Sequence, residues 1–253
     1  MEAKDKIIVP LDVSGVGKAT ELVNLLSPYV GFFKIGLEFI WSSIAELILF
    51  PEPEAIALLK MIRTLATAIG GLHCFIDAKL ADIPNTVKGA SVAVSRMGVR
   101  MFNVHASAGK EAILQAVANK RNSLVLGVTV LTSIDGDECV SIFGEEPREK
   151  VIEFATMLVD AEADGVICSP QELEALRVFD PGVLLRVTPG VRPKWAAIGD
   201  QKRVMTPGEA IKAGADYLVI GRPITKPPPE IGGPVEAAKK IAEEIAQALE
   251  QKK

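Results

Sequence analysis

Short apolar segments alternate along the chain with longer segments in which apolar residues recur every three to four positions. The short segments are typical of buried parallel strands, and the longer ones of amphipathic helices that cover a sheet. Strands are predicted at 6–13, 31–37, 72–78, 100–105, 123–131, 165–168, 183–188 and 217–221. Helices are predicted near 18–26, 54–69, 86–97, 110–119, 148–163, 171–178, 207–213 and 235–250, with an extra helix in the longer connection 37–53.

The order of these elements predicts the fold class. Alternating strands and helices favour a parallel sheet, and eight such units favour a closed (β/α)8 barrel, the TIM barrel. The length of 253 residues is typical of one such barrel. A division at 51–53 would separate strands that have to pair, so we expect a single domain over 1–253.

Composition and charge narrow the class of protein. Hydrophobic residues make up 49% of the chain and charged residues 24%, as in an ordinary globular protein. A net charge of −4 offers no positive surface for nucleic acid or for an anionic membrane. The most apolar stretch, 39–50, contains two serines and a glutamate and is too short to span a bilayer. Residues 1–6 lack the apolar core of a signal peptide, and Cys74, Cys139 and Cys168 are widely spaced, so we expect a cytoplasmic protein with reduced cysteines.

Charged and polar residues gather where the predicted strands end. In a (β/α)8 barrel, active sites are built at the carboxyl ends of the strands. The residues at these ends are Asp12, Lys34, Asp77, Lys79, His105, Thr132, Arg192 and Arg222. Charges beside apolar strands carry a desolvation cost, so their concentration here indicates a ligand site.

The third predicted strand ends in the pattern Asp-x-Lys-x-x-Asp, formed by Asp77, Lys79 and Asp82. Side chains alternate along a strand, so Asp77 and Lys79 point the same way. Charges this close shift one another's pKa and can handle protons without a metal. The alternative is a salt-bridged strand end followed by Asp82 as a helix cap before Pro84. In isolation the pattern would favour that alternative, but the other strand ends favour a functional site.

Three further strand-end residues are candidates for the same site. Lys34 lies within an apolar strand and therefore needs a carboxylate partner, for which Asp77 on the adjacent strand is available. Asp12 can accept hydrogen bonds from sugar hydroxyls, or it can cap the next helix. His105 can act as a general base, although a histidine in this setting is more often a hydrogen-bonded structural residue.

The loops after the seventh and eighth strands form an independent candidate site for phosphate, which barrels of this type often bind there. Gly221 allows close approach of the backbone, and Arg222 can bind a phosphate through two hydrogen bonds. Arg192 and Gln201, in the loop after the seventh strand, can contribute further donors, while Arg203 is expected to be solvated surface charge.

Four segments carry these features: 77–86 (DAKLADIPNT), 128–133 (VTVLTS), 199–210 (GDQKRVMTPGEA) and 215–225 (ADYLVIGRPIT). Together they resemble the orotidine 5′-phosphate decarboxylase family, in the order and on the strands expected of it. The resemblance covers nearly the whole chain. It departs at Leu80-Ala81, where many members carry an aromatic or aliphatic residue and a histidine, but neither residue belongs to the charged set.

The resemblance implies decarboxylation of orotidine 5′-phosphate to uridine 5′-phosphate, a step of de novo pyrimidine biosynthesis. Lys34, Asp77, Lys79 and Asp82 would form an alternating network, in which Lys79 delivers a proton to C6 of the pyrimidine as carbon dioxide leaves. Asp82 would come from the other subunit of a homodimer with shared active sites and, with Asp12, would contact the ribose.

The resemblance also assigns the remaining substrate contacts. Thr132 would lie near the pyrimidine ring, and Thr86 is a further expected substrate-binding residue. The phosphate would be held by Arg192, Gln201, Gly221 and Arg222. No cofactor and no metal are implied, because an ammonium supplies the positive charge that a metal would otherwise supply.

Two alternatives stay open at the level of sequence. The first is a Mg²⁺-dependent decarboxylase or aldolase of the same barrel group acting on a sugar phosphate. In that group a carboxylate metal ligand replaces the strand-two lysine, whereas this chain has Lys34, which cannot ligate Mg²⁺. The second is a catalytically silent ligand-binding barrel, which would have lost Lys79 or Asp77 while keeping Arg222; this chain has all three.

Overall fold

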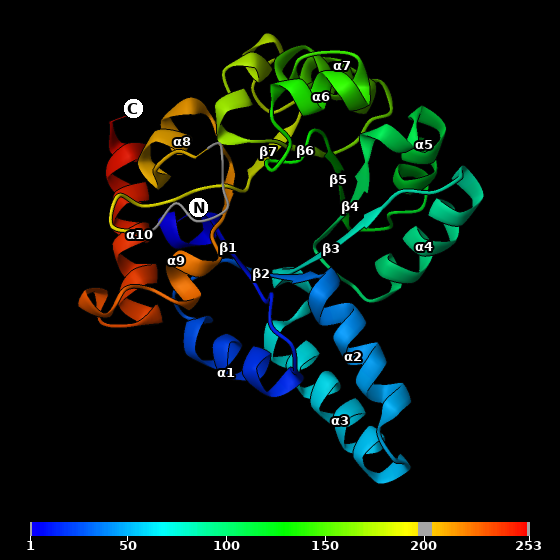
Figure 1. Ribbon diagram of the computed structural model, residues 1–253, viewed down its shortest axis with the longest axis vertical. Helices are drawn as coiled ribbons and strands as arrows, with labels where there is room; N and C mark the ends of the chain where they lie inside the picture. Colours follow the sequence, from blue (N-terminus) through cyan, green and yellow to red (C-terminus); the bar gives the residue numbers. More distant parts are fainter. Residues whose placement is uncertain (1, 197–203, 252–253) are drawn as a thin grey trace.

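The computed structural model describes residues 2–196 and 204–251. Its strands form a closed barrel in chain order, and every neighbouring pair is parallel (Figure 1). The strands are β1 Ile7–Pro10, β2 Phe32–Gly36, β3 Cys74–Leu80, β4 Met101–His105, β5 Leu124–Val128, β6 Gly165–Ile167, β7 Leu185–Thr188 and β8 Tyr217–Val219. The predicted (β/α)8 barrel is confirmed.

Seven of the strands lie within the predicted segments, and β3 is the exception. It begins and ends two residues later than expected and so includes Lys79 and Leu80. Lys79 has a positive φ of 49°, which is the left-handed backbone region and is uncommon for a residue other than glycine. The end of β3 is therefore irregular at the position of a predicted site residue.

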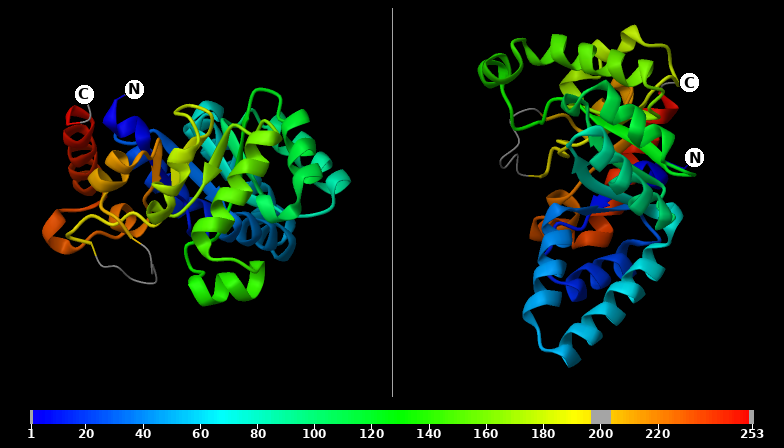
Figure 2. Two further views of the ribbon diagram at one scale, coloured as in Figure 1. Left: turned by 90° about the horizontal axis from the view of Figure 1, so that it is seen from above. Right: turned by 90° about the vertical axis from the view of Figure 1, so that its right-hand side faces the viewer.

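Helices surround the barrel in the expected positions. They are α1 Val16–Leu26, α2 Leu37–Leu49, α3 Glu52–Ile69, α4 Pro84–Arg96, α5 Lys110–Ala118, α6 Gly136–Phe143, α7 Pro147–Asp160, α8 Pro207–Ala213, α9 Arg222–Thr225 and α10 Pro234–Glu250. The extra helix predicted between residues 37 and 53 is α2, and with α3 it forms a hairpin that projects from the barrel (Figures 1 and 2). The helices α6 and α9 were not predicted.

One predicted helix is wrong. The segment 171–178 forms two 3₁₀ turns, Pro170–Glu172 and Ala175–Val178. A segment of about two turns has little helical stability of its own. In its place, the guanidinium of Arg186 donates hydrogen bonds to the carbonyls of Leu176 and Phe179 and holds the segment against β7.

The core divides into two layers. A large cluster fills the space between the barrel and the helices, and a smaller one fills the barrel interior. The interior cluster consists of Ile8, Phe75, Met101, Leu126, Val187 and Tyr217. These side chains fill the barrel below the carboxyl-terminal mouth, and Asp77, two positions beyond Phe75 on β3, lies on the same face of the strand and lines that mouth.

The structure also bears on the predicted burial of the cysteines and on the prediction that the chain does not span a membrane. Cys74, Cys139 and Cys168 are all buried, and burial raises the pKa of the Cys74 thiol to about 12. Within residues 2–196 and 204–251, no helix has the length and apolar character needed to cross a bilayer.

Candidate active site

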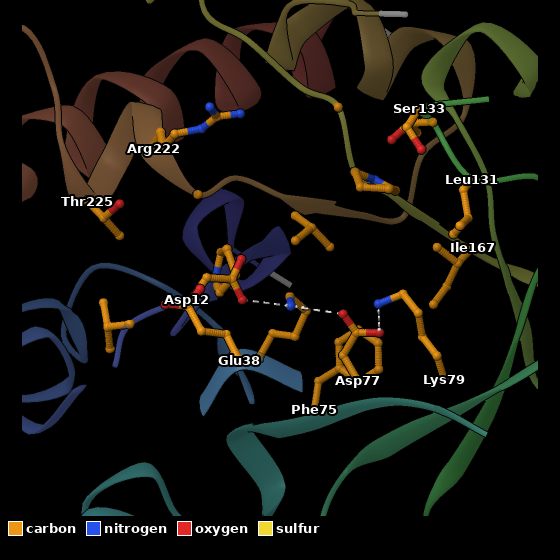
Figure 3. Close-up of a pocket in the computed structure, with 18 of the residues that line it drawn as sticks. Asp12, Glu38, Phe75, Asp77, Lys79, Leu131, Ser133, Ile167, Arg222 and Thr225 are labelled. Carbon is orange, nitrogen blue, oxygen red and sulfur yellow. Dashed lines mark hydrogen bonds and ion pairs between the residues drawn. The ribbon is translucent and has the colours of Figure 1, made fainter. Parts of the chain in front are cut away.

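A cavity of about 950 Å³ opens at the carboxyl ends of the strands (Figure 3). It is lined by residues that lie within or after every strand except β4. The predicted site residues that line it are Asp12, Lys34, Asp77, Lys79, Thr132, Arg192, Gly221 and Arg222. The structure thus brings together residues that are up to about two hundred positions apart in the chain.

A row of alternating charges lies along one wall of the cavity. Lys34 Nζ is 3.2 Å from Asp12 Oδ1 and 2.8 Å from Asp77 Oδ2. The other oxygen of Asp77 is 2.7 Å from Lys79 Nζ. The dashed lines in Figure 3 connect this row, to which β1, β2 and β3 each lead. The predicted pairing of Lys34 with Asp77 is therefore present.

Burial and charge act in opposite directions on the middle of this row. Burial alone would raise the pKa of Asp77, but the ammonium groups of Lys34 and Lys79 outweigh it and lower that pKa. Burial alone would lower the pKa of Lys34, but Asp77 and Asp12 outweigh it and raise that pKa. Both groups are therefore charged at neutral pH, although Asp77 and Lys34 are almost fully buried.

Glycine is needed beside this row. A Cβ atom on Gly36, the last residue of β2, would lie 2.8 Å from Lys34 Nζ and 3.1 Å from Asp12 Oδ1. Any side chain at this position would displace the ammonium or the carboxylate. Sequence reasoning did not single out Gly36, because the restriction depends on where the side chains of Lys34 and Asp12 lie in the folded site.

Asn103 on β4 is a second residue that sequence reasoning missed. Its side chain is fully buried and donates a 2.6 Å hydrogen bond from Nδ2 to Asp77 Oδ1. Its Oδ1 accepts a 2.7 Å hydrogen bond from the backbone N–H of Lys79. No motif marked this asparagine in advance, since its importance depends on its place opposite β3.

His105 lies two residues further along β4 and is not among the residues that line the cavity. Burial lowers the pKa of its imidazole, and the positive charge of Lys79 lowers it further, with Asp77 opposing. Its place outside the cavity lining favours a structural role over that of a general base.

The phosphate candidates lie at the other end of the cavity. Figure 3 shows Arg222 and Thr225 well separated from Lys79. Arg222 begins the short helix α9, directly after Gly221, where a Cβ atom would approach Pro10 Cγ to 3.0 Å. Arg192 is buried and lines the same cavity, whereas Gln201 lies outside the residues that the structure describes.

Asp82 and Thr86 are separate from the rest of the predicted set. Both are exposed, and neither lines the cavity of its own chain. Asp82 Oδ1 accepts a 2.7 Å hydrogen bond from the N–H of Ile83, which precedes α4. The carboxylate therefore bonds the N-cap residue itself, and Ile83 at that position provides no side-chain cap for α4.

Fold and cavity together define a (β/α)8-barrel protein with a charged site at the carboxyl ends of its strands. Residues 5–241 match the model of the orotidine 5′-phosphate decarboxylase / HUMPS family. The chain belongs to this family, as the sequence motifs predicted.

Known relatives cover almost the whole chain. The orotidine 5′-phosphate decarboxylase of Moorella thermoacetica is 44% identical over 97% of this chain and 94% of its own length. That of Heliobacterium modesticaldum is 41% identical over 98% of this chain and 99% of its own. The crystal structure of orotidine 5′-phosphate decarboxylase from Lactobacillus acidophilus superposes with a TM-score of 0.73 at 29% identity, covering 94% of this chain and 98% of that one.

Proposed function

We propose that this protein decarboxylates orotidine 5′-phosphate to uridine 5′-phosphate in pyrimidine biosynthesis, without a metal or cofactor. The observation that carries the proposal is the Lys34–Asp77–Lys79 row in a cavity whose far end holds Arg222. The names of the curated relatives support the same reaction. A nucleotide monophosphate has its base and its phosphate at opposite ends, which matches the distribution of charge in the cavity.

Lys79 is the proton donor in this mechanism. The bond between C6 of the pyrimidine and the carboxylate carbon breaks, carbon dioxide leaves, and the electron pair stays on C6. The Lys79 ammonium then transfers a proton to C6, and the resulting amine is reprotonated from solvent. An ammonium held beside Asp77 at 2.7 Å is charged and oriented before the substrate arrives.

Asp77 lies against the substrate carboxylate in this arrangement. Two accounts of its effect are compatible with the geometry. In the first, repulsion between the two carboxylates favours loss of carbon dioxide. In the second, the preorganised row of charges stabilises the carbanion that develops at C6. Both require Asp77 to be ionised, which agrees with the lowering of its pKa by the two lysines.

The other residues bind the substrate. Asp12, together with Asp82 of the other subunit, contacts the ribose, and Thr132 lies near the base. Lys34, which donates a hydrogen bond to Asp12, is a further substrate-binding residue. The residues assigned to the phosphate are Arg192, Gln201, Gly221 and Arg222.

The protein acts as a cytoplasmic homodimer in this proposal. Asp82 and Thr86 come from the partner, which agrees with their exposure and with their absence from the cavity of their own chain. A complete site then consists of Lys34, Asp77 and Lys79 from one subunit and Asp82 from the other.

The main alternative is a Mg²⁺-dependent reaction on a sugar phosphate, since the family description includes a second name. Such a reaction needs a carboxylate where β2 carries Lys34. Here the Lys34 ammonium lies between Asp12 and Asp77, and a cation in that place would be repelled by it. The position of Lys34 therefore favours the metal-free decarboxylation.

The test is loss of the orotate chromophore when the purified protein meets orotidine 5′-phosphate, with uridine 5′-phosphate identified as product. Lys79→Ala serves as the inactive control, and Lys110→Ala, which changes an exposed lysine paired with Asp160, as the matched surface control. No loss of absorbance with folded protein would overturn the proposal, and Mg²⁺-dependent turnover of a sugar phosphate would replace it.

A further inference from the structure

The hydrogen-bonding ladder between β3 and β4 is interrupted at the active site. Ile76 pairs with Phe102, but the next pair is Leu80 with Val104. Three residues of β3, 77–79, thus face a single residue of β4, which is Asn103. This stretch contains both Asp77 and Lys79, and its backbone lacks the regular partners that would otherwise fix it.

At this interruption Lys79 adopts an unfavourable backbone conformation. Its φ of 49° is left-handed, a region disfavoured for residues with a Cβ atom. Such a conformation persists only where the surroundings hold it. In the free strand the residue would relax toward ordinary β geometry, and its side chain would then turn toward another face.

The side chain of Asn103 accepts one backbone hydrogen bond from this stretch and donates another to the Asp77 carboxylate. Its carbonyl oxygen accepts from the Lys79 N–H at 2.7 Å, and its NH₂ group donates to Asp77 Oδ1 at 2.6 Å. The orientation of the amide follows from chemistry, because only the oxygen can accept and only the NH₂ can donate to a carboxylate. The same Asp77 oxygen accepts from Lys79 Nζ, so one amide fixes both ends of the Asp77–Lys79 pair.

We propose that Asn103 is a positioning residue for the reaction: its amide bridges the interrupted strand pairing at Lys79 N–H and at the Asp77 carboxylate, and so holds both residues in their reactive geometry. The inference rests on the proposed function for the identity of the reaction. Asn103 does not line the cavity, so it acts through Asp77 and Lys79 and makes no contact of its own with a substrate there.

Two variants of similar size separate positioning from packing. Asn103→Leu keeps most of the volume and removes both hydrogen bonds. Asn103→Asp keeps the acceptor, but as a carboxylate it faces Asp77 and repels it. When that new carboxyl group is protonated, its carbonyl accepts from Lys79 N–H and its O–H donates to Asp77, as the amide does.

We expect both variants to lower kcat about 10²-fold near neutral pH, the effect typical of a small displacement of a reacting group. KM should change less than about threefold, since the phosphate contacts are untouched. The kcat of Asn103→Asp relative to the unchanged protein should rise as pH falls through the pKa of its carboxyl pair, while that of Asn103→Leu stays flat. Asp12, Lys34, Lys79 and His105 are the other charged or titratable groups around this site, and Asn103→Leu, which keeps all four without the new carboxyl group, is the control for them.

Ser123→Ala is the matched control, because it also removes a buried hydrogen bond, from Ser123 Oγ to Val99 O, away from the cavity. It should leave kcat unchanged. Amide hydrogen exchange of residues 74–80 should quicken in Asn103→Leu but not in Ser123→Ala, and this measurement needs no turnover. If the protein without substitutions has no decarboxylase activity, the proposed function alone is overturned. The hydrogen exchange measurement still tests whether Asn103 holds Lys79 in place.

Three results would overturn the positioning role. They are a kcat of Asn103→Leu within about threefold of the unchanged protein, an Asn103→Asp ratio that does not vary with pH, and unchanged hydrogen exchange at Lys79.

Discussion

Lys34 Nζ lies 2.8 Å from Asp77 Oδ2, and both side chains are about nine-tenths buried. A buried charge without a partner is strongly destabilising, so each group depends on the other. Asp77 also meets Lys79 through its second oxygen, and it therefore separates two ammonium groups that would otherwise repel each other. Asp77 is therefore the central charge of the row, shared by both ammonium groups.

Neutralising Asp77 should therefore destabilise the protein in a pH-dependent way. Asp77→Asn leaves Lys34 and Lys79 facing a neutral amide, and we expect a loss of about 3 kcal/mol at pH 7, the lower end for a broken buried pair because the cavity admits water. The pKa of Asp77 is lowered by folding, so its stabilising contribution is present above the unfolded pKa of about 3.9 and is lost as pH falls through the folded value.

Urea unfolding at several pH values checks this prediction. The difference in free energy of unfolding between the unchanged protein and Asp77→Asn should be largest near neutral pH and should shrink below about pH 4. A difference that stays constant across this range would show that the ionised state of Asp77 does not contribute.

Lys79→Ala should leave the fold intact and reduce kcat by several orders of magnitude. General acid catalysis alone contributes about 10²–10⁴-fold, and the same ammonium also stabilises negative charge on C6. Circular dichroism checks the fold, and the exposed Lys110→Ala variant should keep full activity. A loss of less than about tenfold would remove Lys79 from the role of proton donor.

Activity should survive exhaustive dialysis against a chelator. The reason is the Lys34 ammonium, which lies at hydrogen-bond distance from both carboxylates that a divalent cation would need. The measurement is decarboxylation before and after chelation, with added Mg²⁺ as the comparison. Loss of turnover that Mg²⁺ restores would favour the sugar-phosphate reaction.

Arg222→Ala should impair decarboxylation of the phosphorylated nucleotide far more than that of the unphosphorylated nucleoside. An arginine–phosphate pair in a cavity is a strong charge-assisted interaction, and binding energy from a remote group can be expressed in the chemical step. We therefore expect kcat as well as KM to suffer. Arg177→Ala, in a 3₁₀ turn away from the cavity, is the control. An equal effect on both substrates would place the phosphate elsewhere.

The sequence was sufficient for the barrel because each strand is a compact apolar segment and most of the strands are followed by charged or polar residues. It was also sufficient for Lys34, Asp77 and Lys79, since a lysine in an apolar strand requires a carboxylate on the neighbouring one. It could not reveal the interrupted pairing of β3 with β4. That break leaves no compositional signal, and only the pairing register makes Asn103 the partner of Lys79.

The missed helices have a similar explanation. The helix α6 follows a turn-rich stretch, and its start depends on Asp135 accepting a hydrogen bond from the N–H of Glu138. The single turn of α9 begins at Arg222, where the sequence suggests a loop. In both cases local hydrogen bonds and packing against the barrel decide the outcome more than periodicity does.

The last prediction concerns Asp82, which is exposed and does not line the cavity of its own chain. If the partner's Asp82 completes each site, inactive Lys79→Ala and Asp82→Ala proteins should regain activity when they are unfolded together and refolded. Random pairing makes about half of the dimers mixed, and each mixed dimer has one site with both residues intact. Recovery should therefore approach about a quarter of the activity of the unchanged protein.

A matched pair of variants makes this test specific. Lys79→Ala refolded with Asp77→Ala should stay inactive, because Asp77 and Lys79 belong to the same chain and are 2.7 Å apart, so no pairing assembles a complete site. If Asp82 worked within its own chain, the first mixture would stay inactive too. Absence of recovery despite demonstrated subunit exchange would contradict the shared site and leave Asp82 with its local hydrogen bond to Ile83 as its only role.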